Sequence, residues 1–126
     1  MSGAGALAYL SAGAIALWGI AHVIPTRQVV HAFGPISRDN RLVITQEWLA
    51  EAFTMWFIAA VIVITTTAAG AGGPVTEWVY RAAAVMLAAI ATLTASTGAK
   101  TPVTWFRICP VLLASAATLL IVASWP

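Results

Sequence analysis

Residues 42–69 read LVITQEWLAEAFTMWFIAAVIVITTTAA, and within this apolar run only Glu47 and Glu51 carry charge. A helix needs about 20 mostly apolar residues to cross the hydrocarbon core of a bilayer, and this run is long enough to extend past that core. The strands of a membrane barrel would alternate apolar and polar residues, whereas this run is continuously apolar. The stretch therefore predicts a membrane-spanning helix.

Three more apolar stretches lie on either side of this one, at about residues 5–24, 76–96 and 102–124. The first ends at Pro25, which suits a helix end because proline lacks a backbone N–H. A signal peptide would have a basic start before its apolar run, and this stretch has none, so we read it as a helix of the mature protein. The sequence predicts an all-α fold, a single transmembrane domain in which four helices form a bundle, with one longer loop over residues 25–41.

The composition excludes several other classes of protein. Of the 126 residues, 61% are hydrophobic and 8% are charged, against roughly 45–50% and about 25% in soluble domains. So few charges cannot cover a soluble surface, and such high hydrophobicity excludes disorder. Nucleic-acid binding needs a basic face, and the formal net charge is only +2. The expected surroundings are therefore a lipid bilayer and not nucleic acid.

The basic residues predict the orientation of the bundle. Five of them lie in or beside the loops that follow the first and third helices: Arg27, Arg38, Arg41, Lys100 and Arg107. The opposite side has only Arg81, which follows Glu77 at the spacing of a favourable helical pair. The positive-inside rule places the basic loops in the cytoplasm and both termini outside. We expect a multi-pass protein of the bacterial cytoplasmic (inner) membrane. Tryptophans near helix ends fit an interfacial aromatic belt: Trp48, Trp78, Trp105 and Trp125.

Polar side chains gather at the end that this rule assigns to the cytoplasm. Glu47 and Glu51 are four residues apart, so they share one face of the second helix. Glu51 lies roughly 14 Å along the axis from Leu42 at 1.5 Å per residue, and a charge at such depth usually faces the bundle interior or a wet cavity. Two carboxyl groups in different surroundings can supply an acid and a base, and His22 could share a proton with them. Glu47, Glu51 and His22 are the candidate catalytic residues.

Two explanations of the remaining polar residues stay open. In the structural one, Glu47 lies at the level of the headgroups and Glu51 pairs with Arg107, because a bundle must neutralise the charge that it buries. In the functional one, Arg107 and Arg41, with Asn40 beside them, orient an oxygen or an anionic group of a substrate.

The tryptophans in the middle of helices have a similar pair of explanations. Trp18 and Trp56 lie away from the helix ends. They either fill volume in the core or form an aromatic wall around an apolar ligand, where they could stabilise a developing carbocation by cation–π attraction. In the second case both are substrate-binding residues.

The sequence contains no recognisable metal motif. His22 and His31 are separated by Pro25, and the Glu-x-x-His spacing of di-iron bundles is absent. Cys109 has no second cysteine to pair with, and buried single cysteines mostly pack as small apolar groups. We therefore expect neither a metal nor a cofactor.

The chain resembles the small bacterial membrane proteins of the DoxX-like type. The resemblance lies in residues 18–22 (WGIAH), in the Glu47-x-x-x-Glu51 stretch and in the turn at 98–102, within a layout of four short helices. It implies a four-helix membrane fold. Most members have no assigned activity, and some are tied to sulfur or quinone-linked redox chemistry; this chain lacks a cysteine pair for such chemistry. A looser similarity is to the four-helix sterol isomerases, although their spacing of histidine and glutamates is not reproduced.

The sequence favours a membrane-embedded protein that binds a small apolar or lipid-like molecule in a polar cavity facing the cytoplasm. If the protein is an enzyme, the glutamates predict acid–base chemistry without a cofactor, as in an isomerase, a cyclase or an epoxide-opening hydrolase. Two alternatives stay open: a non-catalytic accessory subunit of a larger membrane complex, and a small proton-coupled transporter that uses Glu51. Four helices enclose only a small interior, which favours a homodimer.

Overall fold

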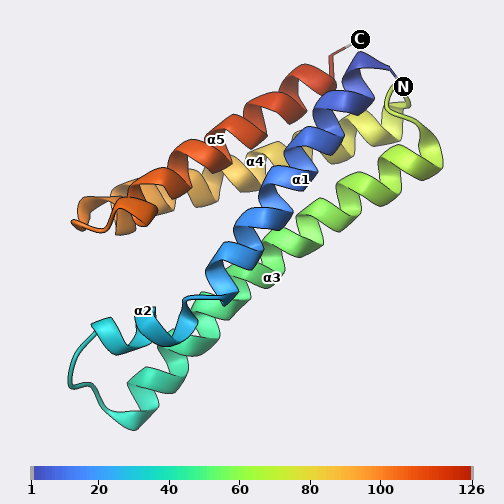
Figure 1. Cartoon of the computed structure of the whole chain (residues 1–126). Helices are drawn as coiled ribbons and strands as arrows, with labels where there is room; N and C mark the ends of the chain where they lie inside the picture. The colour runs from blue at the N-terminus through green and yellow to red at the C-terminus, as the bar shows by residue number, and fades with distance from the viewer. Residues whose placement is uncertain (1, 126) are drawn as a thin grey trace.

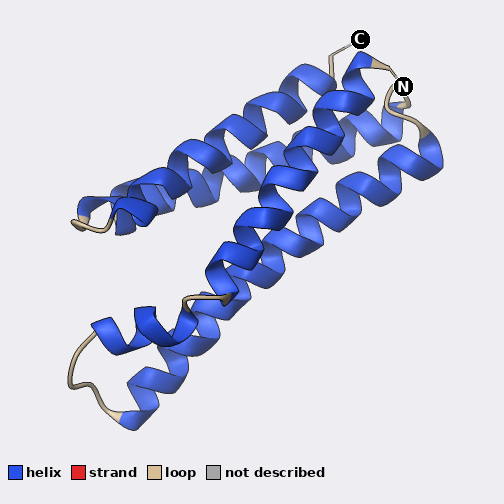
Figure 2. Ribbon diagram, in the orientation of Figure 1, coloured by secondary structure: helices blue, strands red, loops and turns tan. Residues whose placement is uncertain are grey.

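The computed structural model describes residues 2–125, which form helices and connecting turns without a strand. Figures 1 and 2 show the helices in order: α1 (Gly3–Val23), α2 (Thr26–Ala32), α3 (Arg38–Ala69), α4 (Pro74–Ser96) and α5 (Thr104–Ala123), with a 3-10 turn, Gly98–Lys100, before α5. Four of them, α1, α3, α4 and α5, are long and apolar enough to cross a membrane. The prediction of an all-α protein with four apolar helices packed together is confirmed.

The four long helices alternate in direction along the bundle. α1 begins and α5 ends at one end of the molecule, whereas α2 and the start of α3 lie at the other (Figure 1). α1 packs against both α3 and α5, and α4 packs mainly against α5. Completely buried side chains from all four helices fill the interior: Ile15, Met55, Ile62, Leu87 and Leu113.

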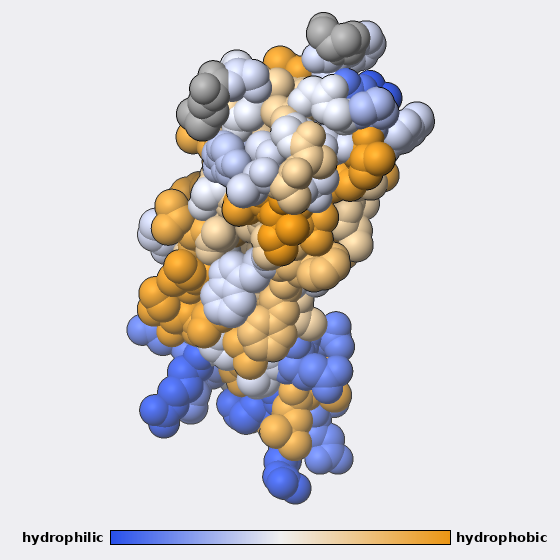
Figure 3. All heavy atoms as spheres, turned by 90° about the vertical axis from the view of Figure 1, so that its right-hand side faces the viewer, coloured by the Kyte–Doolittle hydropathy of each residue, from blue (hydrophilic) through white to orange (hydrophobic). Residues whose placement is uncertain are grey.

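The outer surface of the bundle is apolar over its middle and hydrophilic at the α2 end (Figure 3). Large apolar side chains are exposed on the outer surface of every long helix, among them Leu17, Phe57, Val85 and Val111. In water such a surface would be costly, whereas in a bilayer it faces lipid and the helices satisfy their own backbone groups. The surface is therefore that of a multi-pass membrane protein.

α1 and α3 approach closely at Gly19. The indole of Trp56 lies against the backbone of α1 there, and its Nε1 donates to the Ala16 carbonyl oxygen over 3.1 Å. A Cβ atom on Gly19 would lie 2.6 Å from that Nε1 and 3.2 Å from the Ala52 carbonyl oxygen. Only glycine therefore leaves room for the indole, and Trp56 serves the packing of two helices.

The segment over 25–41 is more ordered than a plain loop. It contains α2, whose His31 is exposed, and α3 begins at Arg38, earlier than the apolar run alone indicates. The reason is a local cap: Ser37 Oγ accepts the backbone N–H of Asn40 over 3.1 Å, and Asp39 adds negative charge to the first turn.

The opposite end of the bundle is tied together by Arg81. Its guanidinium donates to the carbonyl oxygen of Ser124, just past the end of α5, over 2.8 Å, and lies 3.7 Å from the carboxylate of Glu77. Carbonyl groups at the C-terminus of a helix have no partner within the helix. Arg81 therefore closes α5 onto α4, and the expected Glu77–Arg81 pair is present.

Candidate functional site

His22 lies in the last turn of α1, where Pro25 stops the helix. Its ring is buried, and Nδ1 lies 3.0 Å from the carbonyl oxygen of Trp18 one turn earlier. A carbonyl oxygen only accepts hydrogen bonds, so Nδ1 carries the hydrogen of this bond. In neutral imidazole the lone pair is then on Nε2, and Nε2 is the atom that faces Glu51.

Glu51 approaches His22 from α3. Oε1 lies 3.8 Å from Nε2 of His22, a distance too long for a hydrogen bond. The side chain is 26% exposed, but Oε1 itself is buried and has no hydrogen-bond partner among the described residues. Buried polar atoms nearly always have a partner, and an exception calls for an explanation such as an ion or a ligand.

Aromatic rings hold the imidazole in place. Trp48 stacks on it with ring centres 4.7 Å apart, and Trp18 meets it edge-on at 5.8 Å. Trp48 also donates from Nε1 to the His22 carbonyl oxygen over 2.7 Å, and its ring lies 5.7 Å from that of Phe106 on α5. Two indole rings and the bond from Nδ1 to the Trp18 carbonyl oxygen therefore fix the orientation of the His22 ring.

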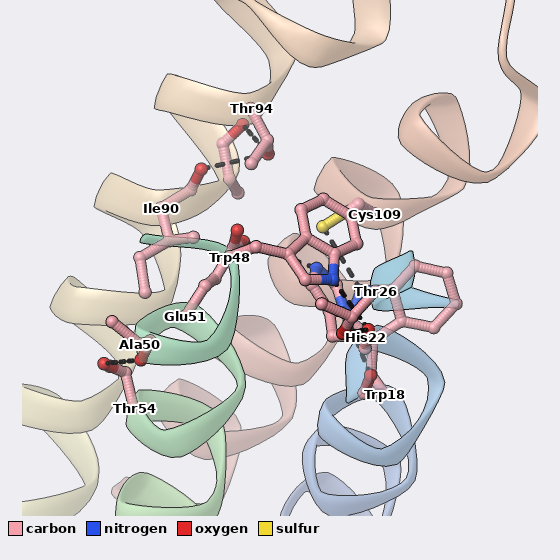
Figure 4. Close-up of polar contacts among 11 residues, drawn as sticks. Trp18, His22, Thr26, Trp48, Ala50, Glu51, Thr54, Ile90, Thr94 and Cys109 are labelled. Atoms are coloured by element: carbon pink, nitrogen blue, oxygen red, sulfur yellow. Dashed lines mark hydrogen bonds and ion pairs between the residues drawn. The ribbon is translucent and has the colours of Figure 1, made fainter. Parts of the chain in front are cut away.

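Cys109 brings a third helix to the same place. This buried thiol lies in α5, and Trp18 Nε1 donates to its Sγ over 3.2 Å. One nitrogen of His22, one oxygen of Glu51 and the sulfur of Cys109 all lie within 4.8 Å of one another. Figure 4 shows these side chains gathered between α1, α3 and α5. We call His22, Glu51 and Cys109 the polar cluster.

The other residues expected at a site do not join the polar cluster. Glu47 is exposed and accepts a long hydrogen bond, 3.5 Å, from Gln46. Arg107 is exposed and donates to the Thr101 carbonyl oxygen over 3.2 Å, and no ion pair in residues 2–125 links it to Glu51. Asn40 and Arg41 lie in the first turn of α3, about three turns before Glu51 on the same helix. Of the residues that were expected to bind substrate, Trp18 alone contacts the cluster.

Sequence reasoning did not find the roles of Cys109 and Trp48. Their positions along the predicted helices could have identified them. Cys109 lies near the start of the last helix, and that helix starts at the end of the bundle where the first helix ends. Trp48 precedes Glu51 by three residues and therefore shares its helical face. In the sequence Trp48 lies close to the start of the apolar run at Leu42, a position that fits an interfacial belt equally well, so the sequence does not distinguish the two roles.

Two shallow apolar grooves lie elsewhere, along α4 and α5. The larger, about 710 Å³, is lined by small side chains that include Ala91, Ala95 and Ala114, and the smaller is about 390 Å³. No residue of the polar cluster lines either groove. The grooves are apolar lipid-facing surface, and the polar chemistry lies on the other side of α5.

Three kinds of chemistry are open to the polar cluster. A ligand that bridges the 3.8 Å between Nε2 of His22 and Oε1 of Glu51 can exchange protons with both groups. A ligand with a polar head can bind Oε1 of Glu51, and the three donor atoms can hold a cation. The resemblance to DoxX-like proteins stays a prediction. The chain matches no family model, no curated protein and no solved structure.

Proposed function

We propose that this protein binds a small apolar or lipid-like molecule that carries an oxygen-bearing head, and that the head lies against His22 and Glu51. The observation that supports this proposal is Oε1 of Glu51, which is buried and has no hydrogen-bond partner within residues 2–125. Leaving such an atom unpaired costs about 1–3 kcal/mol. A ligand hydroxyl that donates to Oε1 would remove this cost, while the apolar part of the ligand remains in lipid.

The pair formed by His22 and Glu51 suits acid–base chemistry on such a head. The bond from Nδ1 to Trp18 leaves Nε2 free to accept a proton, and the carboxyl group 3.8 Å away can donate one. In an isomerisation, one group protonates the ligand and the other removes a proton from a neighbouring position, so the composition of the ligand does not change. Cyclisation and epoxide opening begin with the same protonation.

The polar cluster would open to the cytoplasmic face of a bacterial inner membrane, with both termini outside. Hydrophilic residues gather at the end formed by α2 and the start of α3 (Figure 3). Arg27, Arg38 and Arg41 are on these helices. The positive-inside rule assigns such an end to the cytoplasm.

The test is extraction of the full-length protein, purified in mild detergent, followed by mass spectrometry of the molecules that remain bound. Glu51→Gln is the test variant, and Glu47→Gln is its matched control because that carboxylate is exposed one turn away. We expect one class of lipid-like molecule, enriched above bulk lipid, in the wild type and in Glu47→Gln but not in Glu51→Gln. Equal retention by all three proteins, or no enrichment in any, would contradict the proposal. A protein partner at fixed stoichiometry without a bound small molecule would favour the accessory-subunit alternative.

A further inference from the structure

The polar cluster combines three different metal-binding groups that come from three helices. The donor atoms of His22, Glu51 and Cys109 lie within 4.8 Å of one another, and in the described part of the chain Oε1 of Glu51 has no hydrogen-bond partner. We propose that the polar cluster binds one divalent transition-metal ion of the zinc type. The imidazole, the carboxylate and the thiolate are its three protein ligands.

The distances fit an ion of this size after small side-chain movements. Zinc lies about 2.0–2.1 Å from nitrogen, 2.0–2.2 Å from oxygen and 2.3 Å from sulfur, in tetrahedral geometry. Two ligand atoms around such an ion are therefore roughly 3–4 Å apart. Nε2 and Oε1 are 3.8 Å apart, and rotation of the cysteine and glutamate side chains can close the remaining gap.

The residues around the donor atoms support the same assignment. A metal-binding histidine almost always donates its other ring N–H to an acceptor, which fixes the ring and exposes the lone pair to the metal. Here Nδ1 of His22 donates to the Trp18 carbonyl oxygen. Trp18 also donates from its indole Nε1 to the sulfur of Cys109 over 3.2 Å, and this hydrogen bond would stabilise a thiolate. Trp18 therefore supports two of the three ligands.

Charge balance explains how the polar cluster can be buried in a membrane protein. An isolated carboxylate or thiolate is costly at that depth. One carboxylate and one thiolate balance the two positive charges of a divalent ion, and neutral His22 adds none. Hard ions such as Mg²⁺ and Ca²⁺ prefer oxygen ligands, whereas thiolate and imidazole favour zinc and its neighbours in the transition series.

Three protein ligands leave one tetrahedral position free, as in catalytic zinc sites. This part of the inference rests on the proposed function: the free position would take the oxygen of the ligand's head group. A bound ion polarises such an oxygen as a Lewis acid. The ion would then take the place of the ligand hydroxyl as the partner of Oε1, and the oxygen of the head group would bind the ion itself.

The experiment uses the full chain purified in detergent without a metal-affinity tag. The protein is stripped with a chelator, equilibrated with Zn²⁺, desalted and analysed for zinc per chain. We expect about one zinc ion per chain for the wild type, and a loss of at least about tenfold for Cys109→Ser and His22→Phe, by analogy with the loss of supporting residues in other metal sites. Glu47→Gln and His31→Asn are matched controls and should retain the ion, because both residues are exposed outside the cluster.

Co²⁺ provides a second readout that does not depend on zinc analysis. The wild type with Co²⁺ should show thiolate-to-metal charge-transfer absorption, and Cys109→Ser should lack it even if that variant is fully folded. Failure of the wild type to retain zinc, or equal retention by Cys109→Ser, would overturn the metal assignment. Lipid extracted from the same samples tests the proposed function separately. Enrichment of a lipid-like molecule in a protein that retains no zinc would support the proposed function and contradict the metal site. Retention of zinc without such enrichment would support the metal site and contradict the proposed function.

Discussion

The indole Nε1 of Trp18 donates to Sγ of Cys109 over 3.2 Å, a contact that joins the first long helix to the last. The backbone carbonyl of the same tryptophan accepts from His22 Nδ1. One residue therefore positions two members of the polar cluster, and Glu51 completes it from α3. Residues far apart in the chain meet because α1 ends, and α5 begins, at the same level of the bundle.

The close approach of α1 and α3 predicts different effects on stability for two glycine substitutions on α1. Gly19→Ala should lower the stability in detergent by about 1–3 kcal/mol, as overpacking does, because the new Cβ would overlap the indole of Trp56. A Cβ atom on Gly13 would meet no atom of residues 2–125 within 4 Å, so Gly13→Ala should be neutral or slightly stabilising, since alanine favours helix more than glycine does. Thermal unfolding of both variants tests this; a Gly19→Ala variant as stable as Gly13→Ala would show that the indole is not packed there.

Trp48 should stabilise the end of α1 through its hydrogen bond as well as its ring. Trp48→Phe keeps an aromatic ring beside His22 but removes the donor to the His22 carbonyl oxygen. We expect a loss of about 0.5–1 kcal/mol, at the low end because Thr26 also donates to that oxygen. Trp105→Phe, at an exposed position, is the control and should change stability by less than about 0.5 kcal/mol. Equal effects in thermal unfolding would argue against the Trp48 bond.

Arg81 should contribute more to stability than its ionic partner Glu77 at the end of the bundle opposite α2. Arg81→Gln removes the bond that closes α5 at Ser124, and we expect a loss of about 1 kcal/mol, reduced by partial exposure from the 1.5–3 kcal/mol of hydrogen bonds to charged groups. Glu77→Gln removes only a partly exposed i,i+4 pair at 3.7 Å, and such helical pairs are worth about 0.3–0.5 kcal/mol. Denaturation in detergent at low and high salt separates the two, since the pair alone should weaken with salt. A larger loss of stability in Glu77→Gln than in Arg81→Gln would show that the ion pair is the main contact and would contradict this prediction.

The proposed orientation predicts which loops a membrane-impermeant thiol reagent can reach in intact cells. In a Cys109→Ser background, Asn40→Cys lies at the α2 end and Gly72→Cys in the turn between α3 and α4; both positions are exposed. We expect labelling of Gly72→Cys from outside and of Asn40→Cys only after the cells are opened. The reverse pattern would invert the topology and place the polar cluster near the outer face.

The fold was predictable because each spanning helix is a long apolar run, and such runs in lipid have few alternatives to a helix. Other features were not predictable from hydropathy. α2 is short and polar, and the early start of α3 depends on the Ser37 cap rather than on apolar residues.

The site was predictable only in part. His22 and Glu51 are unusual residues for a membrane helix, and the structure places them together. Cys109 looks like an ordinary small apolar residue in the sequence, and only the packing of α5 against α1 reveals its partners. Glu47 shares a helix with Glu51 but is exposed. The sequence did not predict this difference, because helical periodicity places two residues on one face without saying how deep in the bundle each one lies.

The most direct test of the central claim, that His22 and Glu51 act as one binding site, is a double-mutant cycle. The measured quantity is the amount of lipid-like molecule retained per chain by the wild type, His22→Phe, Glu51→Gln and the double variant, each with its unfolding temperature recorded to exclude loss of the fold. The effects of substituting two residues of one site are not additive. We predict that each single variant loses the bound molecule and that the double variant loses no more. Retention by either single variant, or independent losses that add in the double variant, would contradict the account.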